Sequence, residues 1–328
     1  MGKHLRPGQA HVQPTVIRRR AAIAHPAGAV VSGIQACHAD LERARRSLAG
    51  LSLGDAFGDR FDGPPGQVRA QLQRRELPGG PWRVTDDTMM AMAVIEVLSE
   101  HGRIDQDALA HRLGTRYLRE PARGYGAGAH QILARIAAGE HWSRAARAVF
   151  EGAGSMGNGG AMRAAPVGAY FADDPARAAR EAARAAEVTH AHPDGQAGAV
   201  AVALAAAWIA NGTRRPELLF ERVLAMTPAG DTRTVLQRAA LLSLATPVTE
   251  AAARLGSGRR VLSSDTVPFA LWCAARHLGD YQAALWSTVA GLGDRDTTCA
   301  IVGSLVALAP GVLLPADWIA AREPIDGL

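Results

Sequence analysis

Acidic and hydroxyl side chains gather at two places where a loop leads into an apolar helical stretch. One is residues 85–88 and the other is residues 294–297, about two hundred residues further along the chain. The candidate metal ligands there are Thr85, Asp86, Asp87, Asp294, Asp296 and Thr297. Carboxylate and hydroxyl oxygens are hard ligands, which suit Mg²⁺, Mn²⁺ or Ca²⁺ better than Zn²⁺.

Each cluster also fits an ordinary helix N-cap, because Asp and Thr side chains accept hydrogen bonds from the first backbone N–H groups of a helix. However, each cluster carries more oxygen ligands than capping needs. This excess suggests instead that the clusters are two halves of one metal centre. Four carboxylates brought together without cations would repel one another, so bound metal is expected if the clusters meet. The spacing alone does not show that they meet.

A glycine-rich segment, residues 155–163, precedes an alanine-rich helical stretch. Its candidate binding residues are Ser155, Met156, Gly157, Asn158, Gly159, Met162 and Arg163. Glycine has no side chain, so backbone N–H groups can approach an anion at a helix N-terminus. The segment therefore fits a diphosphate, although a flexible loop between helices would have the same composition.

Three weaker patterns lack the context that their usual sites require. Residues 123–129 imitate a dinucleotide-binding fingerprint and residues 153–157 a nucleophile elbow, but neither follows a predicted strand. His190 and His192 have no third ligand in view for zinc. Around His190, hydrogen bonding to a ligand and simple helix capping both remain open.

Charge is unevenly distributed along the 328 residues, whose formal net charge is +5. Residues 1–39 hold five Lys and Arg and no acid, so the remainder carries equal numbers of bases and acids. This balance does not support a basic groove or a stable nucleic-acid partner, although a local patch is compatible with it. Three scattered cysteines, and no run of about 18 apolar residues, predict a reduced cytoplasmic protein without a membrane span.

Abundant alanine and the scarcity of alternating Val, Ile and Thr predict an all-α fold in a single compact bundle. Helical periodicity begins at Asp40, so we predict a basic, disordered tail over residues 1–36 and one domain over residues 37–328. Residues 62–82 are predicted to form a loop. Further helices are predicted near residues 89–98, 105–119, 128–150, 161–171, 174–189, 195–210, 216–227, 231–244, 266–278, 280–291, 296–309 and 315–322.

Taken together, these motifs resemble those of the ADP-ribosylglycohydrolases. The matching segments, in the family order, are Gly54-Asp55-Ala56-Phe57-Gly58, Thr85-Asp86-Asp87-Thr88, Gly157-Asn158-Gly159 with Met162-Arg163, Thr189-His190 and Gly293-Asp294-Arg295-Asp296-Thr297. They span most of the chain, and five modest motifs in this order are highly specific together.

The resemblance implies an orthogonal helical bundle around two Mg²⁺ or Mn²⁺ ions. It implies that the protein removes ADP-ribose from an ADP-ribosylated protein, small molecule or nucleic acid. Asp296 would bridge the ions and belong to the catalytic set, and residues 155–163 would bind the diphosphate and distal ribose. The remaining implied substrate contacts are Asp55, Gly124, Tyr125, Gly126 and His190.

The sequence departs from the family at the position of the catalytic acid or base. Members carry a Glu eight residues after the first Gly of the Gly-Asp-Ala motif, where this chain has Asp62. Asp keeps the charge but loses one methylene of reach, and a misplacement of about 1 Å lowers the rate. Asp59 in the same loop is the other candidate. The alternatives are an ADP-ribose reader with little turnover, or a dinuclear hydrolase of phosphoesters or nucleotides.

Overall fold

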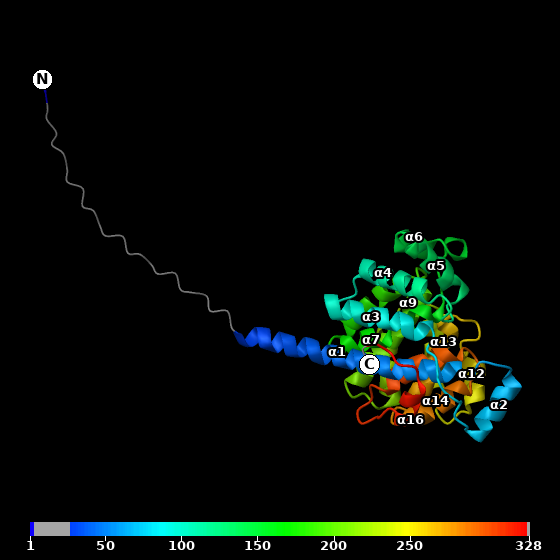
Figure 1. Ribbon diagram of the computed structural model, residues 1–328. Helices are drawn as coiled ribbons and strands as arrows, with labels where there is room; N and C mark the ends of the chain where they lie inside the picture. Colours follow the sequence, from blue (N-terminus) through cyan, green and yellow to red (C-terminus); the bar gives the residue numbers. More distant parts are fainter. Residues whose placement is uncertain (3–26, 327–328) are drawn as a thin grey trace. The chain divides into compact units, whose positions relative to one another are not determined.

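The computed structural model describes residues 1–2 and 27–326. Within helix α1 (Ala27–Asp59), side chains are described for residue 38 and from residue 40 onward. The chain divides into two units, Met1–Ala36 and Cys37–Leu328, and the second holds the predicted site (Figure 1). The predicted disordered tail lies mostly outside the described residues, because residues 3–26 are not among them.

The predicted all-α fold is confirmed. The described residues form sixteen α-helices and two short 3₁₀ helices, and their strand-like pairing is limited to two isolated bridges. After α1 the helices are α2 (Pro65–Arg74), α3 (Asp86–His101), α4 (Gln106–Arg119), α5 (Ala127–Ala137), α6 (Trp142–Arg147), η1 (Phe150–Gly152), η2 (Asn158–Gly160), α7 (Ala165–Tyr170), α8 (Pro175–Glu187), α9 (Pro193–Ala210), α10 (Pro216–Met226), α11 (Asp231–Leu241), α12 (Val248–Leu255), α13 (Ser263–Arg276), α14 (Tyr281–Val289), α15 (Arg295–Val306) and α16 (Ala316–Ala321).

Helix α9 is buried along nearly its whole length and packs against α7, α8, α10 and α13. Its many alanines favour the helix, and their small side chains let neighbouring helices approach. At Gly168 of α7, an added Cβ would lie 2.0 Å from the carbonyl oxygen of Ala203. This central helix is the framework against which the loops of the site are packed.

The Gly-Asp-Ala-Phe-Gly motif has a packing role within α1. A Cβ at Gly54 would lie 2.1 Å from the carbonyl oxygen of Cys299, and one at Gly58 would lie 2.2 Å from that of Arg295. Both carbonyls belong to α15, so the two glycines let the helices touch through their backbones. The contact fixes the acidic start of α15 against the helix that carries Asp55.

An aromatic cluster anchors the end of α1 and the segment that leads into α3. The rings of Phe57 and Trp318 stack at 4.5 Å between centroids, and Phe61 packs edge-on against Phe57 at 4.9 Å. Trp82 packs edge-on against both Phe57 and Trp318, and its indole N–H donates to the carbonyl of Pro78. Large buried aromatic rings supply much of the apolar burial that holds such segments in place.

Some helix boundaries differ from the prediction. Residues 62–82, predicted to be a loop, contain α2, in which only Val68 is buried, so its apolar periodicity is weak. The predicted helix over residues 128–150 is divided into α5 and α6, because Gly139 takes a φ of +91° that ends the first. Helix α1 begins at Ala27 rather than Asp40, in an apolar stretch without helical periodicity. Helix α12 is not predicted either.

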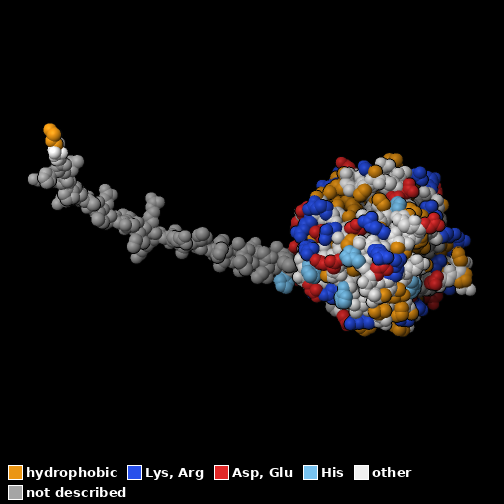
Figure 2. Space-filling view, turned by 90° about the horizontal axis from the view of Figure 1, so that it is seen from above, with side chains coloured by type: hydrophobic (Ala, Val, Ile, Leu, Met, Phe, Trp, Pro, Cys, Tyr) orange, Lys and Arg blue, Asp and Glu red, His pale blue; other side chains and the backbone are white. Residues whose placement is uncertain are grey.

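Among the described residues, no helix has the length and apolar character needed to cross a membrane. Cys273 and Cys299 are buried free thiols. Figure 2 shows basic and acidic side chains interspersed over one face of the second unit, in keeping with the balanced charge of the chain beyond residue 39.

Candidate active site

A cavity of about 570 Å³ lies where the starts of α3 and α15 meet the loop that contains η2. The predicted site residues that line it are Asp86, Gly124, Gly126, Ser155, Met156, Gly157, Asn158, Gly159, Met162, His190, Asp294, Asp296 and Thr297. Segments about two hundred residues apart in the sequence therefore form one concave surface. A cavity with several convergent polar groups is the usual setting for a ligand.

The two acidic clusters are in direct contact. The Thr297 hydroxyl donates to Oδ2 of Asp87 at 3.3 Å, which joins the start of α15 to the start of α3. Asp294 accepts a 2.7 Å hydrogen bond from Nδ2 of Asn158, and its charge helps to raise the pKa of the neighbouring Asp296. The glycine-rich loop and both acidic clusters thus belong to one polar network.

The buried carboxyls in this network have raised pKa values. Burial, and after it the charge of Asp296, raises the pKa of Asp86 to about 8. Burial and neighbouring carboxylates raise the pKa of Asp87 and of Asp296 well above the usual range, and for Asp296 the main neighbour is Asp294. A carboxylate held beside like charges takes up a proton unless a cation neutralises it. The cluster is therefore suited to exchange protons for cations.

The chemistry of these donors fits hard divalent cations. Oδ1 of Asp87 is buried and has no hydrogen-bond partner, whereas buried polar oxygens are normally satisfied. No three His, Cys, Asp or Glu side chains in the described part of the chain are already arranged to hold an ion. Cation binding therefore requires the carboxyls to lose protons and to shift in position. A bound cation would give Oδ1 of Asp87 a partner and would relieve the repulsion between like charges.

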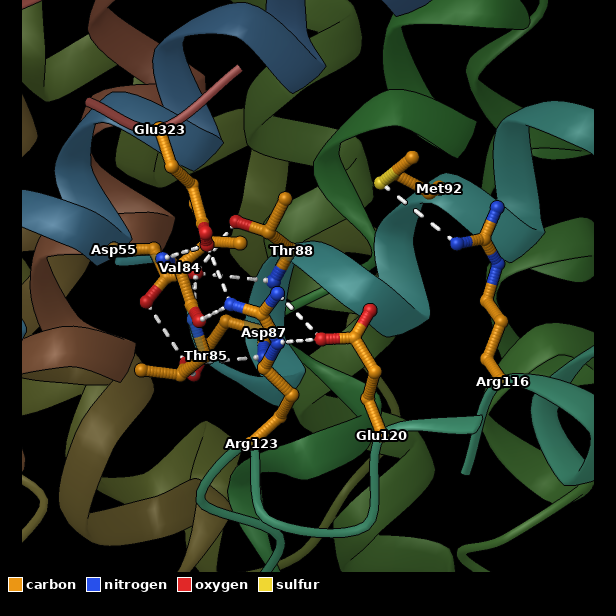
Figure 3. A network of polar contacts seen from close by, with 10 residues as sticks. All are labelled: Asp55, Val84, Thr85, Asp87, Thr88, Met92, Arg116, Glu120, Arg123 and Glu323. Carbon is orange, nitrogen blue, oxygen red and sulfur yellow. Dashed lines mark hydrogen bonds and ion pairs between the residues drawn. The ribbon is translucent and has the colours of Figure 1, made fainter. Parts of the chain in front are cut away.

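Asp55, on α1, holds the start of α3 in place through hydrogen bonds (Figure 3). Its carboxylate is completely buried and accepts hydrogen bonds from the backbone N–H groups of Thr85 (2.9 Å) and Thr88 (3.2 Å) and from their hydroxyls (2.8 and 2.5 Å). The Thr85 hydroxyl also lies 3.1 Å from Oδ2 of Asp87. Asp55 is predicted to contact substrate but does not line the cavity. It fixes the turn that carries the carboxyl groups of α3.

A second set of contacts clamps the segment just before α3 (Figure 3). Arg123 donates to the carbonyl oxygen of Val84 at 3.0 Å and forms a 2.5 Å ion pair with Glu323. Its own carbonyl accepts a 2.7 Å hydrogen bond from the backbone N–H of Asp86. Glu323 in turn accepts from the backbone N–H of Val84 at 2.8 Å. Contacts from the C-terminal region therefore hold the entry to α3.

Arg163 braces the glycine-rich loop from within the protein. It is completely buried, does not line the cavity, and donates to the carbonyl oxygens of Gly159 (2.7 Å) and Ala185 (3.0 Å). It also donates to the Thr189 hydroxyl at 2.7 Å. Burial lowers its pKa to about 10, so it remains charged at neutral pH. Its fork of donors ties the loop to the segment that carries His190.

His190 presents a neutral donor to the glycine-rich loop. Its Nδ1 lies 2.8 Å from the Thr189 hydroxyl, which accepts a hydrogen bond from Arg163 and can donate its own proton to Nδ1. With that donation, the ring proton lies on Nε2. Burial, and then the charge of Arg163, lowers the pKa of His190 to about 3. Because an added Cβ at Gly157 or Gly159 would lie 3.3 Å from Nε2, both glycines leave room around this donor.

The two candidates for the catalytic acid or base lie outside the cavity lining. The Asp62 side chain is 95% exposed, with Oδ1 3.8 Å from Nη1 of Arg295. Arg295 also donates to the carbonyl of Phe61, which holds the loop after α1. Asp59 is half-buried, and burial raises its pKa. As it stands, this loop directs neither carboxyl into the cavity.

Tyr125 is also outside the lining, although its glycine neighbours form part of the wall. Its ring packs edge-on against Tyr117 at 5.2 Å and against His130 at 5.9 Å. Gly124 has a φ of +93°, a conformation that favours glycine, and an added Cβ there would lie 3.6 Å from Oδ1 of Asp86. The backbone of this segment, rather than the Tyr125 side chain, borders the site.

Several cavity residues carry no motif in the sequence. They form an apolar and basic part of the wall, which comprises Met90, Ile132, Phe150, Arg260, Val261 and Leu262. Phe150 and Val261 are exposed hydrophobic side chains whose φ angles are 52° and 56°. Positive φ is uncommon for bulky residues and concentrates at ligand sites. An exposed apolar residue just before the glycines at positions 152 and 154 is the signal that points to Phe150.

The region around this site corresponds to one protein family. The family model for ADP-ribosylglycohydrolase matches residues 37–328, and the chain belongs to that family. A solved structure described as an ADP-ribosylglycohydrolase-related protein complex has the same fold, with a TM-score of 0.61 and 24% identity. The match covers 87% of this chain and 94% of that one.

Curated relatives cover a similar share of the chain. The human ADP-ribosylhydrolase ARH3 is 28% identical over 323 residues, which cover 85% of this chain and 88% of the relative. An uncharacterized protein of Archaeoglobus fulgidus is 30% identical, with 85% and 90% covered. The ADP-ribosylarginine hydrolase Tri1 of Pseudomonas putida is 25% identical, with 85% and 74% covered. Of these relatives, one is named for an ADP-ribosylarginine substrate and one only as an ADP-ribosylhydrolase.

Proposed function

We propose that this protein hydrolyses the N- or O-glycosidic bond between ADP-ribose and an acceptor, with two Mg²⁺ or Mn²⁺ ions as cofactors. The observation that carries the proposal is the meeting of two acidic clusters and a glycine-rich loop in one cavity. The catalytic domain in this proposal is residues 37–328, the span that the family model matches. The acceptor is a protein, a small molecule or a nucleic acid, and the reaction takes place in the cytoplasm.

The glycine-rich loop and His190 bind the diphosphate in this account. Glycine backbone N–H groups approach phosphate oxygens without steric hindrance, and the Nε2–H of His190 adds a donor. Because the pKa of His190 is lowered to about 3, the ring donates a hydrogen bond without exchanging a proton during the reaction. Arg163 keeps this loop in place without touching the ligand.

The carboxyls of Asp86, Asp87, Asp294 and Asp296 and the hydroxyls of Thr85 and Thr297 would hold the metal ions. When bound, such ions polarise the ribose hydroxyls and lower the pKa of water. The protein's own contribution is to bury these oxygens at two helix starts that Asp55 and the α1–α15 contact hold fixed. Once the carboxyls have adjusted to a bound cation, helix starts held in this way would limit further rearrangement during the reaction.

Hydrolysis of the glycosidic bond passes through an oxocarbenium-like state, and a carboxylate positions or deprotonates the attacking water. We assign this role to Asp62 or Asp59, with Asp296 as the carboxylate nearest the reacting atoms. Asp62 is exposed and directed toward Arg295, so the loop after α1 must turn toward the cavity to act. The same observation favours a second candidate function, an ADP-ribose reader that binds its ligand with little turnover.

The test is release of free ADP-ribose from ADP-ribosylated arginine peptide, serine peptide, oligonucleotide and a small aryl acceptor. Each is assayed with Mg²⁺, with Mn²⁺ and with EDTA, beside a simple phosphoester. Metal-dependent release from at least one acceptor is expected. Tight ADP-ribose binding without release from any acceptor would select the reader. Release of phosphate from the phosphoester alone would select a different dinuclear hydrolase.

A further inference from the structure

A second cavity, of about 550 Å³, lies beside the candidate active site. Its walls come from α2, α11, α12 and the loop that follows α12. The basic residues that line it are Arg69, Arg238, Arg254, Arg259 and Arg260, and the one acidic residue in the lining is Asp265. Because the chain beyond residue 39 has equal numbers of bases and acids, five arginines around one cavity are a local concentration of charge.

Two of these arginines have acidic partners. Arg254 pairs with Glu250 one helical turn away at 2.5 Å, and Nε of Arg260 lies 3.4 Å from Oδ1 of Asp265. The backbone N–H of Arg260 also donates to Asp265, at 2.7 Å. These contacts shape the loop after α12 and neutralise part of the charge.

The side chains of the other three arginines, Arg69, Arg238 and Arg259, have no hydrogen bond or ion pair to any described residue. All three are exposed, and they come from α2, α11 and the loop after α12. Like charges that face one concave surface raise its potential and attract anions. Guanidinium groups bind phosphate oxygens in a bidentate manner. The cavity therefore has the chemistry of a phosphate site with room for more than one phosphate.

The arginine-lined cavity is joined to the candidate active site through a shared wall. Arg260 lines both cavities. The loop after α12 contacts the acidic start of α15, because the carbonyl oxygen of Ser257 accepts a 2.9 Å hydrogen bond from the backbone N–H of Asp294. Gly293 lies so close to Ser257 that an added Cβ would meet that oxygen at 1.7 Å. The loop after α12 therefore forms part of the wall of both cavities.

We propose that the arginine-lined cavity binds backbone phosphates of a single-stranded nucleic acid, the acceptor from which ADP-ribose is removed. The open placement of the arginines suits a strand that crosses the surface, and the shared loop places that strand beside the scissile bond. The inference rests on the proposed function for the identity of the acceptor, but not for phosphate binding itself. It deepens that function by naming the acceptor class.

The test variant replaces the three unpaired arginines together (Arg69→Gln, Arg238→Gln, Arg259→Gln). Because these side chains are exposed and without partners, the fold is expected to remain. The matched control replaces three exposed arginines outside the cavity that also lack partners (Arg45→Gln, Arg180→Gln, Arg215→Gln). Both variants lose the same formal charge, so a general effect of net charge changes both equally.

Fluorescence anisotropy with a short unmodified single-stranded DNA measures binding without any reaction. Wild type and control variant should bind alike, whereas the test variant should bind at least about tenfold more weakly. In the test variant, the slope of log K against log salt concentration should be shallower by roughly 2. Each of the three lost phosphate contacts reduces that slope by about 0.7. Equal binding by the test and control variants would overturn the proposed phosphate site. Binding of inorganic polyphosphate but not DNA would overturn the proposal that the ligand is a nucleic-acid strand.

Turnover then tests the acceptor. kcat/KM for an ADP-ribosylated oligonucleotide should fall about tenfold or more in the test variant, while that for an ADP-ribosylated peptide stays unchanged. Equal falls for both substrates would overturn the assignment to the acceptor. If no substrate is hydrolysed but the test variant still loses DNA binding, the phosphate site stands and the proposed hydrolase function fails.

Discussion

Two sets of buried charges in this molecule differ in what surrounds them. Asp55 and Arg163 are completely buried, and neutral hydrogen-bond partners meet all the polar atoms of their side chains except Nε of Arg163. Asp86 and Asp87 are also buried and Asp296 is half-buried, but these three carboxyls face one another, and one oxygen of Asp87 has no partner. The first set holds loops in place, and the second set is left to bind something else. Residue types alone do not separate these roles; the partners do.

The largest expected effect on activity comes from a substitution in the second set, Asp86, Asp87 and Asp296. Asp296→Asn should lower ADP-ribose release by about 1000-fold, the size of a lost principal electrostatic contribution. The same change should leave the metal-free protein as stable as wild type or more so, because it removes like-charge repulsion. Rates of ADP-ribose release and urea unfolding measure the two effects. Asp317→Asn, at an exposed position of α16, is the control, and equal activity in both variants would remove Asp296 from the site.

Asp55 should show the reverse pattern. Asp55→Ala leaves two backbone N–H groups and two hydroxyls without their acceptor, and should lower the free energy of unfolding by about 3 kcal/mol or more. Urea unfolding of metal-free protein measures it. A loss of activity at unchanged stability would instead place Asp55 in contact with substrate.

Arg163→Met should have an intermediate effect on stability and a clear effect on binding. The three oxygens that it satisfies lose their donor, so the free energy of unfolding should fall by about 2 kcal/mol. ADP-ribose affinity should fall with it, because the glycine-rich loop is no longer tied to Thr189. Isothermal titration calorimetry with ADP-ribose checks this. Unchanged ADP-ribose affinity in a destabilised variant would show that the glycine-rich loop does not contribute to binding the ligand.

His190→Ala should have the smallest effect. Loss of one hydrogen bond to the ligand, about 1.4 kcal/mol, weakens ADP-ribose binding about tenfold. Since the ring is neutral, the pH dependence of kcat/KM should not change. A shifted pH profile in this variant would show that His190 exchanges a proton after all.

The sequence predicted which residue types gather at the site better than what each one does there. The acidic clusters and the glycine-rich loop could be identified because their residues are adjacent in the chain. The anchoring role of Asp55 and Arg163 could not, because the partners of Asp55 lie thirty or more positions away and two of the three partners of Arg163 lie more than twenty positions away. Helix α2 was missed because it buries a single side chain, Val68.

The arginine-lined cavity illustrates a second limit. Its charges come from positions 69, 238, 254, 259 and 260, which no local motif connects. Each arginine by itself is typical of a solvated helix face, and only tertiary packing brings them to one surface. The overall charge balance of the chain gave no sign of it.

Metal binding should weaken the pH dependence of stability that the raised carboxyl pKa values cause. The metal-free folded protein binds more protons than the unfolded chain between the usual Asp pKa of 3.8 and about 8, the value for Asp86. The stability from these groups is complete below that window and is lost as pH rises through it. Bound cations hold the carboxyls ionised, so this decline should become smaller in Mg²⁺ or Mn²⁺.

Calorimetric titration of Mn²⁺ into metal-free protein, in buffers of different ionisation enthalpy, tests the metal centre most directly. Near neutral pH we expect binding that releases protons, tightens as pH rises and is lost in Asp296→Asn but retained in Asp317→Asn. Absence of binding, or binding that releases no protons and survives Asp296→Asn, would contradict the assignment of these carboxyls as a metal site.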